Sequence, residues 1–429
     1  MLNTILYWIK RFIPRFALDK IRPPYHYALA YLGNAIYHSP SKEITVIVVT
    51  GTKGKSTVTE LITTILEADG NVVASLSTIQ FKIGEKVQKN LFKMTTPGRF
   101  FVHKFLREAV DAQCTYAVLE MTSEAAKQFR HKFVEMDALV FTNLTPEHIE
   151  SHGSFANYKT AKLEIAKQLE NSAKQPRYIV ANIDDEHGQD FLNIKVEEKL
   201  PYKLSNLKLH TLHKDGIGLI FQHADEEMTI RVPLVGLFNV YNTLAAITLT
   251  RSLGVQLRTI EGALRTLPPI KGRVEHFSTA KDAAKQVTAI VDYAHTPDSL
   301  EKLYQAFKDQ KIIGVLGNCG GGRDTWKRPE MASIAAQYCE HIILTNEDPY
   351  DEEPRKIIDE MMKGIEDKSK VDVIMDRRMA IRKALEIAED GWYVLVSGKG
   401  TDPYIMGPHN TRQPWSDAEV VQKELSLLE

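Results

Sequence analysis

A run of β-branched residues over 45–49 ends abruptly in a glycine-rich loop, and a helical pattern over 56–69 follows. The loop reads Gly51-Thr52-Lys53-Gly54-Lys55-Ser56-Thr57. Its glycines let backbone N–H groups converge on an anion, the helix N-terminus adds partial positive charge, and Lys55 adds a full one. The hydroxyl of Ser56 or Thr57 is then placed to ligate the magnesium ion that accompanies a nucleotide. This order of strand, phosphate loop and helix predicts a nucleotide-binding α/β core.

The composition excludes several classes of protein. A chain of 429 residues is too long for one ordinary hydrophobic core, so we expect two or three domains. Its 54 Lys and Arg residues balance 55 Asp and Glu residues, which leaves no basic excess for general nucleic-acid binding. The 3 cysteines have no metal-ligand spacing and fit a reducing cytoplasm better than a disulfide framework. We therefore predict a cytoplasmic protein that does not bind nucleic acid.

The opening segment, residues 1–43, is short, basic and amphipathic. Within residues 1–40 only Asp19 is acidic, whereas the basic residues are Lys10, Arg11, Arg15, Lys20 and Arg22. These charges follow an apolar stretch and no small-residue cleavage site is evident, which is not typical of a signal peptide. Two interpretations stay open: a helix packed on the protein's own first domain, or a weak peripheral contact with a membrane surface.

Strand and helix patterns alternate through a first domain, residues 44–269. Strands are expected at 45–49, 115–120, 138–143 and 178–183, and helices at 56–69, 154–170 and 240–253. This order predicts an α/β domain with a doubly wound, mostly parallel sheet. Short alternating runs over 204–234 indicate an antiparallel edge or flap. Residues 267–272 have the composition of a linker.

The alternation begins again in a second, smaller domain, residues 270–429. Strands are expected at 287–292, 312–316, 341–345, 371–375 and 392–396, and helices at 297–309, 328–338, 354–366 and 377–388. Five such units predict a Rossmann-like α/β domain with its own doubly wound sheet.

Polar clusters in the first domain follow predicted strand ends, where open parallel sheets bind their ligands. Glu120 ends one strand beside the phosphate loop, and a carboxylate there is suited to hold magnesium. His148 follows the strand that ends near residue 143, and Lys162 lies on the next helix. Taken alone, Glu120 could equally cap a helix, and His148 would more often be an ordinary turn histidine.

The second domain carries similar clusters. Asp292 and His295 lie at a strand-to-helix junction. A glycine-rich loop over 317–324 contains Arg323, which is suited to a carboxylate or a phosphate. An acidic run over 346–353 follows another strand, and its charge favours an ammonium-bearing ligand.

With these residues in view, the chain resembles the Mur ligase family, and within it the branch of the UDP-N-acetylmuramoyl-tripeptide synthetases (the MurE type). The resemblance covers about residues 44–429 and rests on separate motifs in the right order. Besides the phosphate loop they include Thr95-Thr96-Pro97, Glu120-Met121-Thr122-Ser123, Thr142-Asn143-Leu144-Thr145, Phe238-Asn239-Val240-Tyr241-Asn242, Gly272-Arg273-Val274-Glu275, Asp292-Tyr293-Ala294-His295-Thr296-Pro297 and Gly398-Lys399-Gly400.

The resemblance implies an ATP-dependent ligase of peptidoglycan precursor synthesis, which joins a peptide carboxylate to an amine through an acyl phosphate. It implies ATP and two Mg²⁺ ions as cofactors, with Lys55, His148 and Lys162 as catalytic residues. The implied metal-site residues are Ser56, Glu120, His148 and Lys162, of which Lys162 matches a position that is carbamylated in the family. The implied ATP-binding residues are Gly51, Thr52, Lys53, Gly54, Lys55, Ser56, Thr57, Asn239, Asn242, Arg273, Asp292 and His295.

The resemblance also implies small-molecule substrates, a muramoyl-peptide-type donor and an amino-acid acceptor. The donor would contact Thr95, Thr96, Ser123 and Arg130. The acceptor would contact Arg323, Asp348, Tyr350, Gly398 and Asp402. Members that add meso-diaminopimelate carry Asp-Asn-Pro-Arg, whose arginine pairs with the extra carboxylate, whereas this chain reads Glu347-Asp348-Pro349-Tyr350. We therefore expect L-lysine or another amine-bearing acceptor.

The chain departs from the family at its start. The family's UDP-binding domain occupies about a hundred residues before the phosphate loop, but only 44 residues precede the first strand here. We expect that domain to be missing and the donor to be recognised differently, for example as a lipid-linked or shortened molecule. Two rival functions are a folylpolyglutamate synthase and a non-catalytic nucleotide-binding partner, and the intact catalytic set argues against the second. We expect a monomer.

Overall fold

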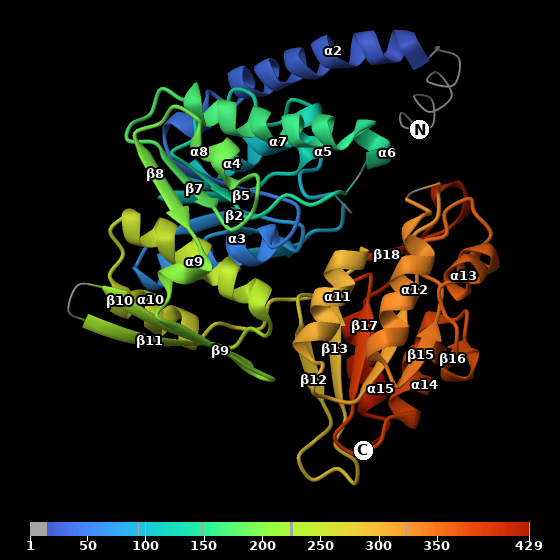
Figure 1. The fold of residues 1–429 in the computed structure, drawn as a ribbon. Helices are drawn as coiled ribbons and strands as arrows, with labels where there is room; N and C mark the ends of the chain where they lie inside the picture. Colours follow the sequence, from blue (N-terminus) through green and yellow to red (C-terminus); the bar gives the residue numbers. More distant parts are fainter. Residues whose placement is uncertain are drawn as a thin grey trace.

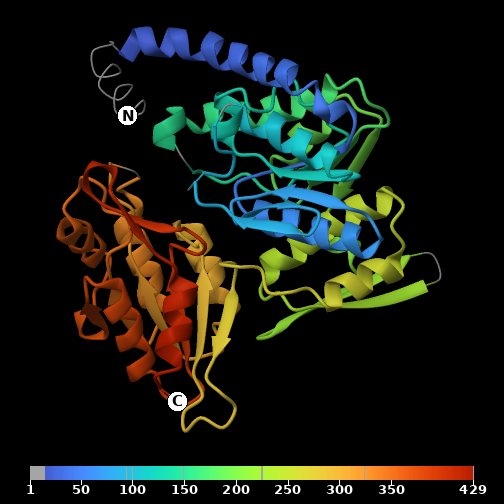
Figure 2. The same ribbon diagram turned by 180° about the vertical axis from the view of Figure 1, so that it is seen from behind.

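The computed structural model describes residues 15–92, 94–98, 100–147, 149–223, 226–322 and 324–428. Figure 1 shows two lobes, an N-terminal lobe coloured from blue to yellow-green and a C-terminal lobe in orange and red. Figure 2 shows the same arrangement from behind. Each lobe is built on its own large, mostly parallel sheet with helices packed against it, which confirms the predicted α/β fold class.

The sheet of the N-terminal lobe has the strand order β4-β3-β2-β5-β1-β6-β7-β8. Its strands are β1 (Thr45–Thr50), β2 (Val73–Leu76), β3 (Gln80–Ile83), β4 (Lys86–Lys89), β5 (Tyr116–Glu120), β6 (Ala138–Phe141), β7 (Tyr178–Asn182) and β8 (Glu198–Tyr202). The central strand β1 pairs in parallel with β5 and β6, so the carboxyl ends of these three strands meet beside the phosphate loop. Strands β2, β3, β4 and β8 were not expected. The antiparallel strands β3 and β4 are short and β4 is exposed along its length, which leaves little apolar pattern.

Helices pack on both faces of this sheet. They are α3 (Lys55–Ala68), α4 (Phe101–Asp111), α5 (Ser123–Lys127), α6 (Ile149–His152), α7 (Phe155–Glu170), α8 (Gly188–Leu192), α9 (Leu237–Ser252) and α10 (Leu257–Arg265). Alternate residues of β1 enter two cores, because Ile47 and Val49 pack with α3 and α9 whereas Val46 and Val48 pack with α4 and α7. Burial on both faces holds the end of β1, and therefore the loop after it, in a defined place.

Residues 204–234 form a separate sheet instead of an edge of the main one. Its strands, in the order β11-β10-β9, are β9 (Leu209–His213), β10 (Gly216–His223) and β11 (Glu226–Val232), and both pairs are antiparallel. Ile217, Leu219, Ile230 and Val232 are buried in the same core as α9 and α10. The alternation of apolar and polar residues in the sequence therefore reflects a three-stranded sheet that packs one face on α9 and α10.

The sheet of the C-terminal lobe has the order β12-β13-β17-β14-β15-β16. Its strands are β12 (Glu275–Ser278), β13 (Thr288–Asp292), β14 (Ile312–Leu316), β15 (His341–Leu344), β16 (Val371–Val373) and β17 (Tyr393–Ser397). The helices are α11 (Pro297–Ala306), α12 (Lys327–Tyr338), α13 (Pro354–Met362), α14 (Arg377–Ile387) and α15 (Asp417–Leu425), and β18 (Tyr404–Met406) and β19 (Arg412–Pro414) form a hairpin. The five predicted strands are parallel, and the unexpected strand β12 adds an antiparallel edge. Single 3₁₀ turns lie at η1 (Pro40–Lys42), η2 (Leu204–Asn206), η3 (Lys368–Lys370) and η4 (Pro408–Asn410).

The N-terminal helix α2 (Arg15–Ile36) lies along the outside of the N-terminal lobe and projects beyond it (Figures 1 and 2). Its last turns pack on the lobe, where Ala30 is buried and Gly33 faces Phe100 and His103. Residues 1–14, which include the first basic residues of the opening segment, lie outside the described residues. Within the part of the chain that the structure describes, no helix is both long and apolar enough to cross a membrane.

Candidate active site

The phosphate loop runs from the end of β1 to the start of α3, and its two glycines are sterically required. Gly51 has φ 144°, and a Cβ there would lie 1.9 Å from Thr142 Oγ1. Gly54 has φ 82°, and a Cβ there would lie 2.2 Å from Asn242 Oδ1. Lys55 Nζ donates to Thr52 O at 2.7 Å, which folds the ammonium group back over the loop. The loop thus brings together a lysine ammonium group, two glycines and the N-terminus of a helix, which are the features of a site that binds an anion.

Glu120 lies at the end of β5 with 2% of its surface exposed, and it faces this loop. Its Oε2 accepts from Ser56 Oγ at 2.8 Å and from Thr78 N at 2.9 Å, and its Oε1 accepts from Thr78 Oγ1 at 3.0 Å. Thr78 also contacts Thr95 Oγ1 at 2.8 Å. A carboxylate beside hydroxyl oxygens is the donor set that Mg²⁺ prefers, so these residues fit the ion that the resemblance implies. Sequence reasoning missed Thr78, because its position after the short strand β2 carries no motif.

Lys162 lies behind the loop, on α7, with 1% of its surface exposed. Its Nζ donates to Gly51 O at 2.5 Å and lies 4.9 Å from the centre of the Tyr158 ring. Burial, and next the charge of Lys55, hold the pKa of Lys162 well below its usual range, although Glu147 opposes the shift. Lys162 therefore loses its proton more readily than an ordinary lysine. His148, the other residue expected here, lies outside the described residues.

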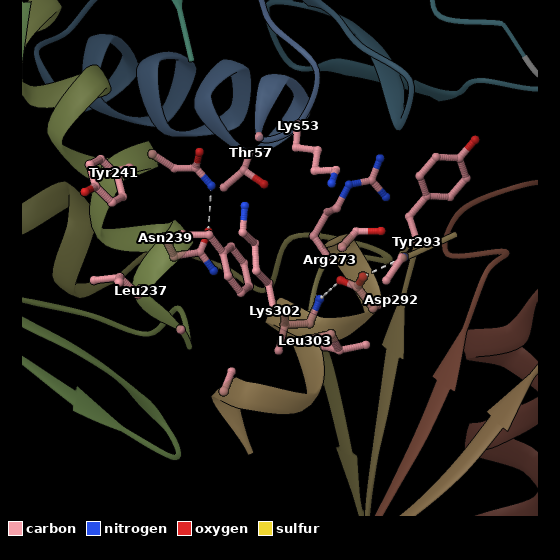
Figure 3. A pocket seen from close by; sticks show the side chains of 18 of the residues that line it. Lys53, Thr57, Leu237, Asn239, Tyr241, Arg273, Asp292, Tyr293, Lys302 and Leu303 are labelled. Atoms are coloured by element: carbon pink, nitrogen blue, oxygen red, sulfur yellow. Dashed lines mark hydrogen bonds between the residues drawn. The ribbon is translucent and has the colours of Figure 1, made fainter. Parts of the chain in front are cut away.

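Arg273, at the start of the C-terminal lobe, reaches across to the phosphate loop. Its guanidinium donates to Ser56 Oγ at 3.4 Å and to Gly272 O at 2.9 Å, and it lies 4.7 Å from the centre of the Tyr293 ring. Asp292 Oδ2 accepts from Val274 N at 2.8 Å, and burial raises the pKa of Asp292. A cation of one lobe thereby faces the phosphate loop of the other (Figure 3).

Two asparagines of α9 complete the nucleotide side of the site. Asn242 Nδ2 donates to Asn239 Oδ1 at 2.9 Å, and Asn239 Nδ2 donates to Val235 O at 2.8 Å. Figure 3 shows Asn239 on the opposite side of the pocket from Arg273 and Tyr293. The place of the two asparagines beside the loop suits them to contact a base or a ribose.

A cleft of about 980 Å³ separates the two lobes and joins these groups. Its lining includes most of the expected nucleotide-binding residues: Thr52, Lys53, Gly54, Lys55, Ser56, Thr57, Asn239, Asn242, Arg273, Asp292 and His295. Glu120, Thr95 and Asp402 also line it, whereas Lys162 is buried behind the loop. Such a cleft has the size of a small-molecule site.

Two side-chain pairs connect the lobes across this cleft. Lys53 of the phosphate loop forms an ion pair with Asp298 of α11. His295 Nε2 lies 3.3 Å from Glu147 Oε1, and His295 Nδ1 donates to Tyr293 O at 2.7 Å. Neither pair was expected, since the partners come from different lobes.

Removing the charge of Asp298 should weaken this closed arrangement. We expect Asp298→Asn to raise the KM for ATP about two- to fivefold with little change in kcat, because a partly exposed ion pair contributes about 0.2–1 kcal/mol. Steady-state kinetics will measure the change. The matched control is Asp359→Asn, which breaks an exposed pair with Arg355 on α13 and should leave KM unchanged. Equal effects of the two variants would contradict a role in closure.

The expected donor residues form a second cluster on the N-terminal lobe. Arg130 Nη1 donates to Thr96 Oγ1 at 3.0 Å. Thr95 lines the cleft and contacts Thr78, as described above. Ser123 Oγ lies 3.1 Å from His152 Nε2.

On the C-terminal lobe, Lys399 organises the expected acceptor residues. Its side chain is fully buried, and its Nζ lies 2.9 Å from Asp348 Oδ1, 3.4 Å from Asp402 Oδ2 and 2.6 Å from Tyr404 O. Asp348 also accepts from Met406 N at 2.8 Å. Asp348 is thus a structural partner of Lys399, whereas Asp402 also lines the cleft.

The neighbouring loops are tightly packed. Tyr350 has φ 52° and lies against Gly321. Gly398 has φ 106°, and a Cβ there would lie 2.3 Å from Oε2 of the buried Glu347. Arg323, the expected partner of the acceptor carboxylate, lies outside the described residues.

Two family models match the chain. The model described as Mur ligase middle domain matches residues 49–250, within the N-terminal lobe. The model described as Mur ligase, glutamate ligase domain matches residues 272–400, within the C-terminal lobe.

Relatives of known name agree with these matches. A "UDP-N-acetylmuramoyl-L-alanyl-D-glutamate--2,6-diaminopimelate ligase" of Syntrophomonas wolfei is 35% identical over 390 residues, which cover 88% of this chain and 77% of that protein. A "UDP-N-acetylmuramyl-tripeptide synthetase" of Roseiflexus sp. is 35% identical over 424 residues, 94% of this chain and 82% of that protein. The solved folylpolyglutamate synthase of Mycobacterium tuberculosis, complexed with ADP, has a TM-score of 0.68 at 16% identity, with 90% of this chain and 95% of that chain covered, and thus shares the fold.

Proposed function

Since this chain belongs to the Mur ligase family, we propose that it joins an amino acid to the carboxylate of a muramoyl-dipeptide-type donor at the expense of ATP. Mur ligases are ATP-dependent ligases of peptidoglycan precursor synthesis, which fixes the class of reaction. The observation that carries the proposal is the opposition of Lys55 and Glu120 on one lobe to Arg273 and Asp292 on the other, across one cleft. No rival function is favoured by a separate observation.

Each group of residues in the cleft has its own proposed role in binding MgATP. When bound, MgATP supplies the phosphoryl group that activates the donor carboxylate. Lys55 and the loop amides would bind the phosphates and neutralise their charge, and Arg273 would add a second cation from the other lobe. Ser56 and Glu120 would hold one Mg²⁺, and His148 is assigned to the second by family resemblance. Asn239, Asn242 and Asp292 would position the nucleoside, which completes the nucleotide site.

Lys162 is proposed to carry a carbamate. Only an unprotonated amine reacts with CO₂, and burial favours the unprotonated amine by lowering the pKa of Lys162. The carbamate would replace a potential cation by an anion beside the phosphate loop, next to Glu120. Its charge would then favour binding of a second divalent ion.

The donor and the acceptor are proposed to enter from opposite lobes. Thr95, Thr96, Ser123 and Arg130 would bind the donor peptide, whose carboxylate must reach Glu120 and Lys55. Arg323, Tyr350, Gly398 and Asp402 would bind the acceptor, with Asp348 holding Lys399 in place. Both halves of the cleft come from one chain, which supports a functional monomer. None of its three cysteines, all of which the structure describes, forms a disulfide, which suits a reducing cytoplasm.

The acceptor is proposed to be L-lysine or a similar amine, even though several relatives are named for 2,6-diaminopimelate. Tyr350 stands where diaminopimelate-adding members carry arginine, so a second acceptor carboxylate would lack its cationic partner. We expect ATP turnover with lysine to exceed that with meso-diaminopimelate by at least about tenfold, measured as phosphate release with UDP-N-acetylmuramoyl-L-alanyl-D-glutamate as donor. The variant Tyr350→Arg should shift the preference toward meso-diaminopimelate.

The same assay separates the alternatives. Faster turnover of the unaltered protein with meso-diaminopimelate would contradict the proposed acceptor but keep the ligase. Turnover that requires a folate and glutamate, and not the muramoyl donor, would instead identify a folylpolyglutamate synthase. Phosphate release that no acceptor stimulates would indicate a nucleotide-binding partner protein. A donor without its UDP group, run in parallel, tests whether the shortened form is accepted.

A further inference from the structure

The outward face of α2 is unusual for a surface helix because it carries no charge after Arg22. Residues 23–36 read PPYHYALAYLGNAI, without a single Asp, Glu, Lys or Arg. The large side chains on the solvent side are Tyr25 (45% exposed), Tyr27 (47%), Tyr31 (56%), Leu32 (46%) and Ile36 (58%). A helix that faces only water normally carries its charged residues on that side. This face, defined by those five residues, is called the tyrosine face below.

The tyrosine face is held outward by packing on the opposite side of the helix. Ala30 is buried, and a Cβ on Gly33 would lie 2.9 Å from Phe100 Cδ1, so no larger residue fits between α2 and the lobe. Two members of the tyrosine face also contact the lobe, since the rings of Tyr27 and Tyr31 lie 5.1 and 5.5 Å from the ring of Phe133, centre to centre. Rigid aromatic side chains lose little conformational freedom on binding, and tyrosine combines an apolar ring with a polar hydroxyl.

The charge of the chain is asymmetric around this helix. The five basic residues of the first 22 oppose only Asp19, whereas the whole chain has a net charge of −1, so the remainder carries an acidic excess. The basic segment directly precedes the tyrosine face in sequence, and the turns from Arg15 to Arg22 belong to α2 itself. An anionic surface would attract this end of the molecule and repel the rest.

We propose that the tyrosine face of α2 binds an anionic lipid membrane, with the helix lying in the plane of the headgroups. Tyrosine is enriched at the membrane interface, where its ring meets acyl chains and its hydroxyl meets water. A basic segment beside an apolar helix face is the usual combination of a peripheral anchor. The absence of acidic residues from 20–36 separates this surface from a typical protein interface, where a polar rim surrounds the apolar centre. The surface lies outside the catalytic cleft and does not depend on the reaction proposed above.

Vesicle binding of the full-length protein tests the proposal. We expect cosedimentation with vesicles of phosphatidylcholine and phosphatidylglycerol at low salt, little binding to phosphatidylcholine alone, and release as salt is raised. The triple variant Tyr25→Ser, Tyr31→Ser, Ile36→Ser should lower the partition coefficient by at least about tenfold. The matched control Val72→Ser, Val87→Ser, Leu209→Ser removes three equally exposed apolar side chains elsewhere and should bind as the unaltered protein does.

Two further measurements complete the test. Circular dichroism and ligase activity without vesicles should be the same for both triple variants, because the tyrosine face is remote from the cleft. Equal vesicle binding by the α2 variant and the unaltered protein would overturn the proposal, as would failure of the unaltered protein to bind phosphatidylglycerol at low salt. A dimer in light scattering that the α2 variant abolishes would also overturn it, since a second copy would then cover this face.

Discussion

Replacing Lys55 by alanine should lower ATP-dependent ligation by about 10³-fold while the protein stays folded. The ammonium of Lys55 is placed over the phosphate loop by its bond to Thr52 O, and two neighbouring cations of the cleft, Lys53 and Arg273, contact Asp298 and Tyr293. The loss should appear in kcat, because phosphoryl transfer develops charge that needs a cation at this point. Single-turnover phosphate release measures it directly.

Lys53, in the same loop, provides the matched control. Its ammonium is bound to Asp298, so Lys53→Ala should raise the KM for ATP several-fold, on the scale of the Asp298 variant, and leave kcat nearly unchanged. A thermal melt checks that both variants fold. If Lys55→Ala and Lys53→Ala lost the same amount of kcat, the assignment of Lys55 to the phosphates would be wrong.

Replacing Lys162 by alanine should lower kcat by about 10²- to 10³-fold, because an anionic group would be lost beside the metal site. Acetate or propionate added to Lys162→Ala should restore part of the activity by supplying a carboxylate in the vacated space. The control variant Lys159→Ala, on the same helix, breaks only a surface ion pair with Asp190, and its kcat should equal that of the unaltered protein. A Lys162→Ala variant of full activity would exclude any role for the carbamate.

The carbamate also predicts a direction for the pH dependence. The pKa of Lys162 is lowered by burial, so the amine is less protonated than an ordinary lysine, and its unprotonated fraction decreases as the pH falls. Carbamate content, followed by ¹³C NMR with labelled bicarbonate, should therefore decline on acidification and recover on return to neutral pH. The free energy of unfolding should also decrease on acidification. Between the pKa values of the folded and unfolded states, Lys162 releases a proton on folding, and a higher proton concentration opposes that release. A signal that Lys162→Ala also shows would belong to another amine.

Local patterns in the sequence predicted the α/β fold class, the central parallel strands and the phosphate loop, whereas Asn239, Asn242 and Arg273 were expected at the nucleotide only from the family resemblance. The parallel strands and the phosphate loop follow from β-branched runs and glycines that lie within a few residues of one another. The contacts that close the site could not be found in this way. Lys53 and Asp298 are separated by 245 positions, and no local periodicity links residues so far apart. Thr78 was missed for a related reason, since its role depends on the neighbouring strand β5 that brings Glu120 to it.

The acceptor side shows a different limit. The acidic run after β15 predicted a site for an ammonium group, and the ammonium that the structure places on Asp348 belongs to the chain's own Lys399. A motif therefore indicates which residues meet, but burial decides whether they meet each other or a ligand. Lys399 is fully buried, and the pairing of a buried charge costs less free energy than leaving it alone.

The buried apolar side chains of the two lobes form separate cores, just as each lobe has its own sheet. Two clusters of buried side chains belong to the N-terminal lobe, and in the two clusters of the C-terminal lobe only Val235 and Phe238 come from before residue 270. Each half can therefore lose its structure while exposing little of the core of the other, so heating should produce two calorimetric transitions in place of one. A nucleotide spanning the cleft would bring those transitions together, because its release would have to accompany the melting of either half.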